Sequence, residues 1–317
     1  MHTITTEREP GQQSPARSRA LRALFIGPQG IRSGWSMLIF LAILMAQILV
    51  TRVPVNHLLH YMHDKQDLQV WSAIVSLGIL ASLVLVATAI MAKIEKRPVL
   101  SYGFMGERRL SRFVLGIAAG VVALSALVLA LKISGYLVFD GQALHGKSAW
   151  SYGLQWGLAF LLTGLFEESL SRLSAVHPDA RHRILVGSPA ALARFGVTHL
   201  PNHGESPIGI LAVVAVGLVF CLSLWLTKSL YWAVGLHTGW DWAQSYIYGV
   251  PNSGQVASGH LFATHPAGGL LWSGGPTGPE GSIYVIPTLA LIALGIWIAR
   301  NQSVQPEEPA VVTVASP

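Results

Sequence analysis

Two adjacent glutamates and an arginine interrupt an apolar run near the middle of the chain. They are Glu167, Glu168 and Arg172, within GLFEESLSRLS (164–174). A charged side chain at the centre of a membrane helix costs roughly 2.5–3.5 kcal/mol to insert, so lipid-exposed positions are excluded for all three. Charges in such a segment face a protein interior or a watery cavity, where they mark functional sites. We therefore expect these residues to face a site at membrane depth.

Helical spacing gives the two glutamates different roles. Glu168 and Arg172 lie four residues apart on one helix face, where they can pair directly. Glu167 is turned about 100° away from that face. A carboxylate held by an arginine stays ionised, whereas its unpaired neighbour can accept and return a proton. The spacing predicts that Glu167 is a general base supported by Glu168 and Arg172; the alternative is an ion-pair clamp between helices.

Two later apolar segments add imidazole and carboxyl groups. In ARFGVTHL, His199 follows Phe195 by four residues. In LYWAVGLHTGWDWAQ, His237 and Asp241 are four residues apart and share a helix face. A single histidine in an apolar helix is most often structural. Three segments that each offer an acid or an imidazole instead indicate one convergent polar site.

Taken in order, these motifs resemble those of the CPBP family, the CAAX proteases and bacteriocin-processing (Abi) proteins. EESLSR matches two glutamates, three residues and an arginine, and FGVTH matches a phenylalanine, three residues and a histidine. HTGWD matches a histidine, three residues and an asparagine or aspartate. The resemblance covers about residues 150–250. It implies an intramembrane endopeptidase similar to the type II enzymes that trim prenylated CAAX proteins.

The resemblance also implies a role for each matched residue. The residues that it places in catalysis are Glu167, His199, His237 and Asp241. Glu167 and His199 would activate a water molecule, and His237 with the residue at 241 would stabilise the oxyanion. Glu168 and Arg172 would hold the geometry of the site. The implied partners are a peptide or protein substrate, lipidated in the prenyl-protease relatives, and the lipid bilayer.

The motifs depart from the family pattern at three positions. The best-studied relatives carry asparagine where this chain has Asp241. An ionised aspartate cannot donate a hydrogen bond to an oxyanion, so Asp241 must be protonated or must orient His237. Ser171 and Leu173 stand where phenylalanine and glycine are usual. These departures keep open a non-catalytic membrane immunity or scaffold protein that retains the family site.

Two further alternatives follow from the same residues. No cofactor is expected for a glutamate mechanism, but Glu167, His199 and His237 would give a catalytic zinc ion two imidazoles and a carboxylate. The enzyme is therefore of the glutamate type or metal-dependent. A proton-coupled transporter could instead use the glutamates and histidines as a proton relay. The chain shows no second half that echoes the first, and such repeats are common in transporters.

The elements that must position these residues are apolar helices. Of 317 residues, 52% are hydrophobic and only 11% are charged, against roughly 25% charged in soluble chains. The composition predicts an all-α, polytopic membrane bundle of about eight transmembrane helices. The expected segments are 35–53, 69–92, 113–134, 153–175, 184–201, 207–227, 229–248 and 283–299.

These segments divide the chain into five parts. We expect a disordered basic cytoplasmic arm (1–34), three N-terminal transmembrane helices (35–149) and a catalytic core (150–250). A Gly/Pro-rich non-cytoplasmic loop (251–282), of a length typical of a lid or cap, precedes the last transmembrane helix and disordered tail (283–317).

Lysine and arginine predict the orientation of the chain. They gather before the first segment and between the second and third, and are sparse in the alternate loops. This bias predicts an integral, multi-pass protein of a bacterial plasma membrane with both termini in the cytoplasm. Because the basic residues flank apolar runs, the net charge of +6 is an orientation signal, and no nucleic-acid partner is expected.

Overall fold

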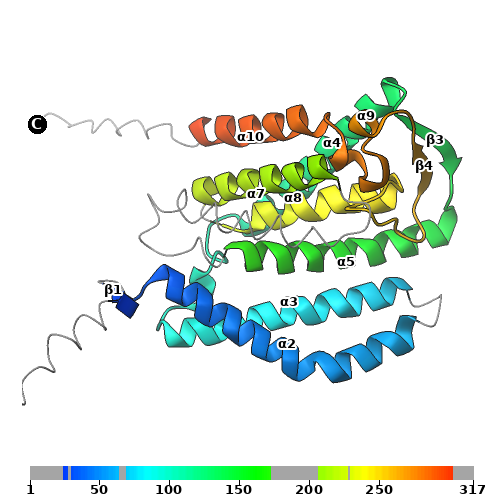
Figure 1. The fold of residues 1–317 in the computed structure, drawn as a ribbon. Coiled ribbons are helices and arrows are strands. Elements are labelled where there is room, and N and C mark those ends of the chain that lie inside the picture. The colour runs from blue at the N-terminus through cyan, green and yellow to red at the C-terminus, as the bar shows by residue number, and fades with distance from the viewer. Residues whose placement is uncertain (1–23, 28–29, 64–68, 173–205, 228, 303–317) are drawn as a thin grey trace, which may run out of the picture.

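A computed structural model describes residues 24–27, 30–63, 69–172, 206–227 and 229–302. The predicted segment 184–201, with His199, lies outside the described residues, as do most of the two terminal arms. The described chain is mostly helical, as predicted (Figure 1). Its long helices are α2 (Ser33–His63), α3 (Gln69–Ile94), α4 (Arg109–Ile133), α5 (Gly146–Arg172), α7 (Pro207–Thr227), α8 (Tyr231–Asp241) and α10 (Val285–Gln302).

Four of the described helices are long and apolar enough to cross a membrane by length and composition. These are residues 34–62, 70–94, 109–133 and 207–226, in α2, α3, α4 and α7. The chain is therefore an integral membrane protein. The expected count of about eight spanning helices is not confirmed. The α5 helix carries charged residues at both ends, α8 has only 11 residues, and α10 contributes a shorter apolar stretch, 285–299.

The segment 251–282, predicted as a loop, folds into an ordered structure that we call the cap. α8 continues into a π-helix, η3 (Trp242–Ile247). The cap then contains β4 (Phe262–Pro266), α9 (Leu270–Ser273) and the 3-10 turns η4 (Gly275–Thr277) and η5 (Pro279–Gly281). β4 pairs antiparallel with β3 (Leu137–Gln142), which lies between α4 and α5. Another short pair joins β1 (Ile26–Gly27) to β2 (Gly30–Ile31), and neither pair was predicted.

Hydrogen bonds fasten the cap and the π-helix to α5. The indole nitrogen of Trp156 donates to the carbonyl of Ser258 at 2.9 Å. The indole nitrogen of Trp242 donates to the carbonyl of Gly153 at 2.8 Å. The Tyr246 hydroxyl donates to the carbonyl of Ala149, also on α5, at 2.6 Å. The first bond ties the cap to α5, and the other two tie the π-helix to the same helix, since indole and phenol groups away from water need such partners.

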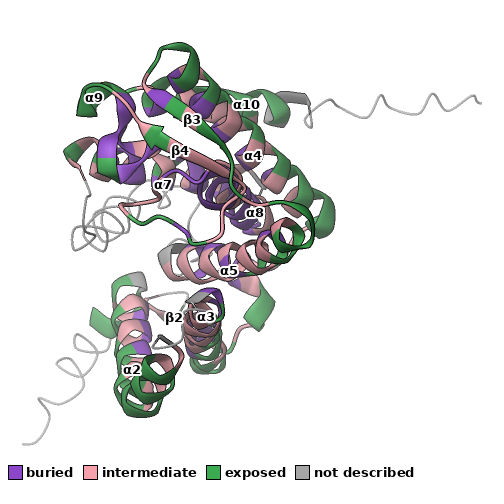
Figure 2. Cartoon of the chain, turned by 90° about the vertical axis from the view of Figure 1, so that its right-hand side faces the viewer, coloured by how far each residue is buried: buried purple, intermediate pink, exposed green. Residues whose placement is uncertain are grey.

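Glycines allow α4 and α8 to pack backbone against backbone. Gly116 and Gly120 on α4 face Gly235 and Gly239 on α8. A Cβ added at Gly239 would lie 2.9 Å from the carbonyl carbon of Ile117, closer than real Cβ atoms approach. Small residues four apart permit this close crossing in membrane helices. Figure 2 shows that α8 is among the most buried elements of the fold.

Polar contacts join α2 to the α3–α4 connection. Glu95, just after α3, accepts hydrogen bonds from the Ser36 hydroxyl at 2.5 Å and from the Tyr102 hydroxyl at 2.6 Å. The Arg97 guanidinium lies 3.4 Å from the same carboxylate and 5.1 Å from the centre of the Tyr102 ring. The Glu95 side chain is only 5% exposed, so this cluster is a buried tie between helices.

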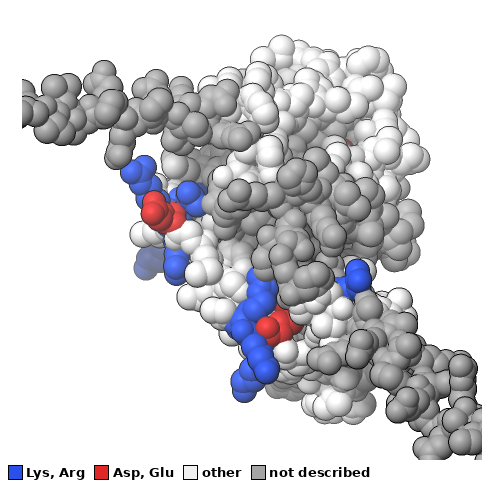
Figure 3. All heavy atoms as spheres, turned by 90° about the vertical axis from the view of Figure 1, so that its left-hand side faces the viewer, with Lys and Arg blue, Asp and Glu red and all other residues white. Residues whose placement is uncertain are grey.

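Basic residues gather at the end of the helical bundle that carries the Glu95 cluster. The face in Figure 3 carries Lys and Arg side chains beside a few acids. The end of α3, the connection after it and the start of α4 supply Lys93, Lys96, Arg97, Arg108, Arg109 and Arg112. This is the charge pattern that predicts a cytoplasmic end, and the orientation itself remains a prediction.

Candidate active site

His237 projects from the face of α8 opposite to its contact with α4. It lies two residues from both Gly235 and Gly239, and at about 100° per residue this spacing turns it away from their face. The ring of Phe220, on α7, stacks on the imidazole with centroids 5.6 Å apart and an interplanar angle of 19°. The glycine contact and the stacked ring together fix the plane and direction of the imidazole.

Another glycine brings α5 close to the same histidine. A Cβ added at Gly164 would lie 3.1 Å from the carbonyl oxygen of Val234 and 3.5 Å from Cβ of His237. Glu167 and Glu168 follow Gly164 by three and four residues, so they lie on the adjoining part of the same helix surface. The close approach at Gly164 therefore carries both carboxyl groups to His237.

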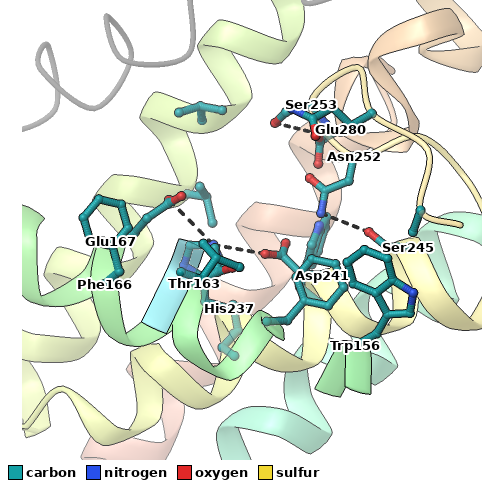
Figure 4. A pocket seen from close by; sticks show the side chains of 18 of the residues that line it. Trp156, Thr163, Phe166, Glu167, His237, Asp241, Ser245, Asn252, Ser253 and Glu280 are labelled. Atoms are coloured by element: carbon teal, nitrogen blue, oxygen red, sulfur yellow. Dashed lines mark hydrogen bonds and ion pairs between the residues drawn. The ribbon is translucent and has the colours of Figure 1, made fainter. Parts of the chain in front are cut away.

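The imidazole lies among three carboxyl groups, and Figure 4 shows two of them, those of Glu167 and Asp241. Nδ1 of His237 is 3.1 Å from Oε1 of Glu168. Nε2 is 3.4 Å from Oδ2 of Asp241 and 3.9 Å from Oε2 of Glu167. The exposed fraction of the side chain is 1% for Glu168, 11% for Asp241 and 23% for Glu167. Glu167 is thus the most accessible acid of the group.

The contact with Glu168 distinguishes the two ring nitrogens. An ionised carboxylate only accepts hydrogen bonds, so Nδ1–H of His237 donates to Glu168. Nε2 is then the nitrogen presented to Glu167 and Asp241. The 3.9 Å separation from Glu167 is too long for a hydrogen bond. A water molecule or a substrate oxygen bound between them can contact both.

Glu167, His237 and Asp241 line one end of a cavity of about 810 Å³. The described residues around it come from α3, α5, α7, α8, α10 and the cap. Aromatic side chains make up much of its wall; they are Trp156, Phe160, Phe166, Phe220 and Trp240. A largely apolar wall with a few converging polar groups is typical of a site that binds an organic substrate.

The cap supplies the opposite end of this cavity. Asn252, Ser253 and Glu280 line it there (Figure 4). Nε2 of Gln244 donates to Oε2 of Glu280 at 3.0 Å. The backbone N–H of Ser253 donates to the other oxygen of Glu280. The cavity therefore has two polar ends, one built on α5 and α8 and one built on the cap.

The structure brings together four of the six residues predicted for the site. Glu167, Glu168 and Asp241 lie around the imidazole of His237. His199 falls outside the described residues, and α5 ends at Arg172, whose side chain is not described. The expected pairing of Glu168 with Arg172 and the roles assigned to His199 therefore remain predictions.

Sequence reasoning missed the cap residues of the cavity. Glu280 lies in GGPTGPEGS, where a glutamate among glycines and prolines is usually a surface residue. Gln244 follows Asp241 by three residues, so helical spacing past the HTGWD motif could have found it. The cap-side position of Glu280 had no such signal.

The zinc alternative depends on a residue that is not described. Among the described residues, no group of three or more His, Cys, Asp or Glu side chains could hold a metal ion. Glu167 and His237 could supply one carboxylate and one imidazole of such a site, and His199 would have to supply the third ligand.

Comparison with known proteins supports the resemblance found in the motifs. Residues 149–243 match the family described as Rce1-like, type II CAAX prenyl endopeptidase. The matched range includes Glu167, Glu168, His237 and Asp241, and it supports the CPBP resemblance over this part of the chain. Neither the comparison with curated proteins nor that with solved structures finds a match.

Proposed function

We propose that this protein is an intramembrane endopeptidase of the CAAX-protease type, in which Glu167 activates the attacking water. The observation that carries the proposal is the convergence of Glu167, His237 and Asp241 at one end of a single cavity, with Glu168 fixing the imidazole. Carboxyl and imidazole groups that meet in a largely apolar cavity can move protons at the bound substrate.

The first step forms a tetrahedral intermediate. Glu167 is the accessible acid, so its carboxylate takes a proton from a water molecule bound beside it. The water oxygen then attacks the carbonyl carbon of the scissile peptide bond, and the carbonyl oxygen becomes an oxyanion. Holding the water and the carbonyl together in the cavity removes much of the entropic cost of this step.

Nε2 of His237 faces the position where the negative charge develops. A hydrogen bond donated there stabilises the oxyanion, an effect usually worth about 2.7–4 kcal/mol per donor. Asp241 is close enough to Nε2 to share a proton with it. This contact lets Asp241 act as a protonated donor or as the group that keeps the imidazole protonated.

The second step breaks the carbon–nitrogen bond. The oxyanion collapses to a carboxyl group, and the leaving nitrogen takes the proton that Glu167 holds. The products are a new carboxyl terminus and a free amine, and Glu167 is again ionised. The family resemblance implies that His199 assists Glu167 in these proton transfers.

An apolar groove beside the cavity supports a lipidated substrate. It has a volume of about 390 Å³ and lies between α7 and α10. Its described lining is almost wholly aliphatic, and three of its residues also line the catalytic cavity: Ala212, Val285 and Leu289. A hydrocarbon chain in the groove would lie next to a peptide in the cavity, as a prenylated substrate requires.

The test compares wild-type protein with Glu167→Gln and Glu107→Gln in liposomes. Glu107 is an exposed acid outside the cavity and is the matched control. Fluorogenic CAAX peptides with and without a farnesyl group are the substrates, each assayed with and without a chelator. We expect cleavage by wild type and Glu107→Gln, with the chelator present, and a loss of about 10²–10⁴-fold in Glu167→Gln.

The other outcomes separate the alternatives. Cleavage that stops with the chelator and returns with added zinc would favour the metal-dependent mechanism. Equal cleavage by wild type and Glu167→Gln would contradict the role of Glu167. A wild-type protein that cleaves none of the peptides would favour the non-catalytic and transporter alternatives.

A further inference from the structure

We infer that Glu280 is a specificity-determining residue that binds a lysine or arginine side chain of the substrate at the cap end of the catalytic cavity. The inference rests on the proposed function and goes beyond it, because it concerns which peptides the enzyme selects. It follows from how the carboxylate is held, which groups surround it and how far it lies from His237.

A buried chain of hydrogen bonds holds the Glu280 carboxylate. Gln244 is fully buried. Its Oε1 accepts from the indole nitrogen of Trp240 at 2.8 Å, and its Nε2 donates to the carbonyl of Pro251 at 2.7 Å as well as to Glu280. Because Gln244 is held on both sides of its amide, it cannot turn away from Glu280 without leaving buried polar groups unpaired.

The backbone of the cap fits closely around this glutamate. Gly278, two residues before Glu280, has a φ of +104°, and an added Cβ would meet the carbonyl oxygen of Pro251. The same Cβ would lie 3.3 Å from Nε2 of Gln244. A glycine is required here on both counts. The Glu280 carboxylate thus belongs to a fixed part of the cap and lines the cavity from there.

Neighbouring groups add hydrogen-bond acceptors beside the carboxylate. The amide nitrogen of Asn252 donates to the Ser245 hydroxyl at 3.3 Å (Figure 4), which places its amide oxygen on the other side. The Ser253 hydroxyl donates to Glu280 at 3.2 Å and retains oxygen lone pairs. A carboxylate with such neighbours suits ammonium and guanidinium groups, which only donate hydrogen bonds, and repels a substrate carboxylate.

Helix geometry gives the register of this subsite on a peptide. Gln244 lies seven residues after His237, in the π-helix that continues α8, which corresponds to roughly 10 Å along the helix axis. An extended peptide covers that distance in about three residues. A lysine or arginine roughly three positions from the scissile bond would therefore reach Glu280 while the bond lies at His237.

A purely structural role for Glu280 is the competing explanation. The hydrogen bonds to Gln244 and Ser253 could serve only to fasten the cap to η3. Such a brace would affect all substrates alike, whereas a subsite would affect them according to charge. The experiment must therefore compare charged and neutral peptides within each variant, so that a general loss of activity cancels.

The experiment uses full-length protein in liposomes and N-acetylated fluorogenic peptides that keep the farnesylated CAAX cysteine in an otherwise alanine-rich sequence. Lysine, glutamine or glutamate replaces alanine at each position on both sides of the scissile bond. At one position about three residues from that bond, we expect lysine to lower KM about tenfold relative to glutamine, equivalent to about 1.4 kcal/mol. Glutamate there should raise KM. In Glu280→Gln the ratio of the two KM values should approach one.

Asp140→Asn is the matched control, because Asp140 is an exposed acid on β3 that pairs with His265 outside the cavity. The lysine preference should persist in this variant. A ratio that is the same in wild type and Glu280→Gln, or a preference for lysine at no position, would overturn the inference. A lysine preference lost equally in Asp140→Asn would reduce it to a general surface charge effect and would also overturn it.

A binding measurement separates this inference from the proposed function. Trp156 and Trp240 line the cavity, so their fluorescence reports peptide binding in wild type and in Glu167→Gln, with or without cleavage. Tighter binding of the lysine peptide that depends on Glu280, in protein that cleaves nothing, would support the subsite and contradict the protease. Cleavage without any charge preference would support the protease and contradict the subsite.

Discussion

Oε1 of Glu168 lies 3.1 Å from Nδ1 of His237, a residue 69 positions further along the chain. The two helices that carry these residues meet at Gly164, where an added Cβ would lie 3.1 Å from the carbonyl oxygen of Val234 and 3.2 Å from the Thr238 hydroxyl, both on α8. The second glutamate of the EE pair therefore has a task separate from that of the first. It orients the imidazole, while Glu167 faces the cavity.

The first prediction concerns this orienting contact. Glu168→Gln removes the charge that holds Nδ1–H, so Nε2 no longer keeps its direction and protonation. We expect kcat to fall on the order of 10²–10⁴-fold with KM little changed. Steady-state kinetics on the CAAX peptides measures both. The control is Ser169→Ala, a buried neighbour whose hydroxyl makes no hydrogen bond in the described part of the chain. A Glu168→Gln enzyme with wild-type kcat would rule out this role.

The second prediction tests whether position 241 needs a hydrogen-bond donor. Asp241→Asn places an amide N–H₂ beside Nε2 of His237, whereas Asp241→Ala places nothing there. We expect the asparagine variant to stay active and the alanine variant to lose about 10²–10³-fold in kcat, the usual cost of one oxyanion donor. Both variants are assayed on the same peptide. If asparagine is as damaging as alanine, the carboxyl group itself is needed, and Asp241 acts through the protonation of His237.

The third prediction concerns the close crossing of α4 and α8. Gly239→Ala would push a methyl group into the α4 backbone at Ile117, and overpacking of this kind typically costs about 1–3 kcal/mol. We expect a lower midpoint in thermal unfolding in detergent. Gly295→Ala on α10 is the control because nothing lies within 4 Å of its added Cβ. That variant should be neutral or slightly stabilising, since alanine favours helix. Equal midpoints for the two variants would contradict the close packing.

The fourth prediction is a loss of stability at alkaline pH. Burial and the hydrogen bond to Glu95 raise the pKa of Tyr102 above its ordinary value of 10.0. The folded protein therefore holds the phenol proton more tightly than the unfolded chain does. Its contribution to stability is complete below about pH 10 and declines as the pH rises toward the folded pKa.

Tyr102→Phe should weaken this pH dependence as well as lower the stability at neutral pH. The lost hydrogen bond to a charged acceptor is worth about 1.5–3 kcal/mol. Thermal unfolding of both proteins between neutral pH and pH 11 provides the measurement. An alkaline decline that is just as steep in Tyr102→Phe would assign the effect to other groups.

Much of the site could be predicted because charges are conspicuous in apolar segments. Glu167, His237 and Asp241 were identified from type and spacing alone, and the structure places them around one cavity. The contact of Glu168 with His237 could not be found in this way. Spacing within one helix points to Arg172, whereas the contact with His237 depends on how α5 crosses α8. Such a crossing is a tertiary feature.

The fold was predictable to a similar degree. Seven of the eight expected apolar segments coincide with described helices, and the eighth lies outside the described residues. The crossing of α4 and α8 had a sequence signal in GIAAG and GLHTG, each with two glycines four apart. The cap had a much weaker sequence signal. Glycine and proline in 251–282 indicate turns, but they do not indicate which side chains those turns bring into the cavity.

The glycine contact of α8 with α4 has a consequence for how the site opens. The imidazole and Asp241 belong to a helix that lies directly against its neighbour's backbone, while both glutamates belong to α5. Any movement that parts α5 from α8 carries Glu167 and Glu168 away from His237 together. In the proposed mechanism, water would therefore be activated only while α5 lies against α8, because only then do Glu167 and His237 face each other.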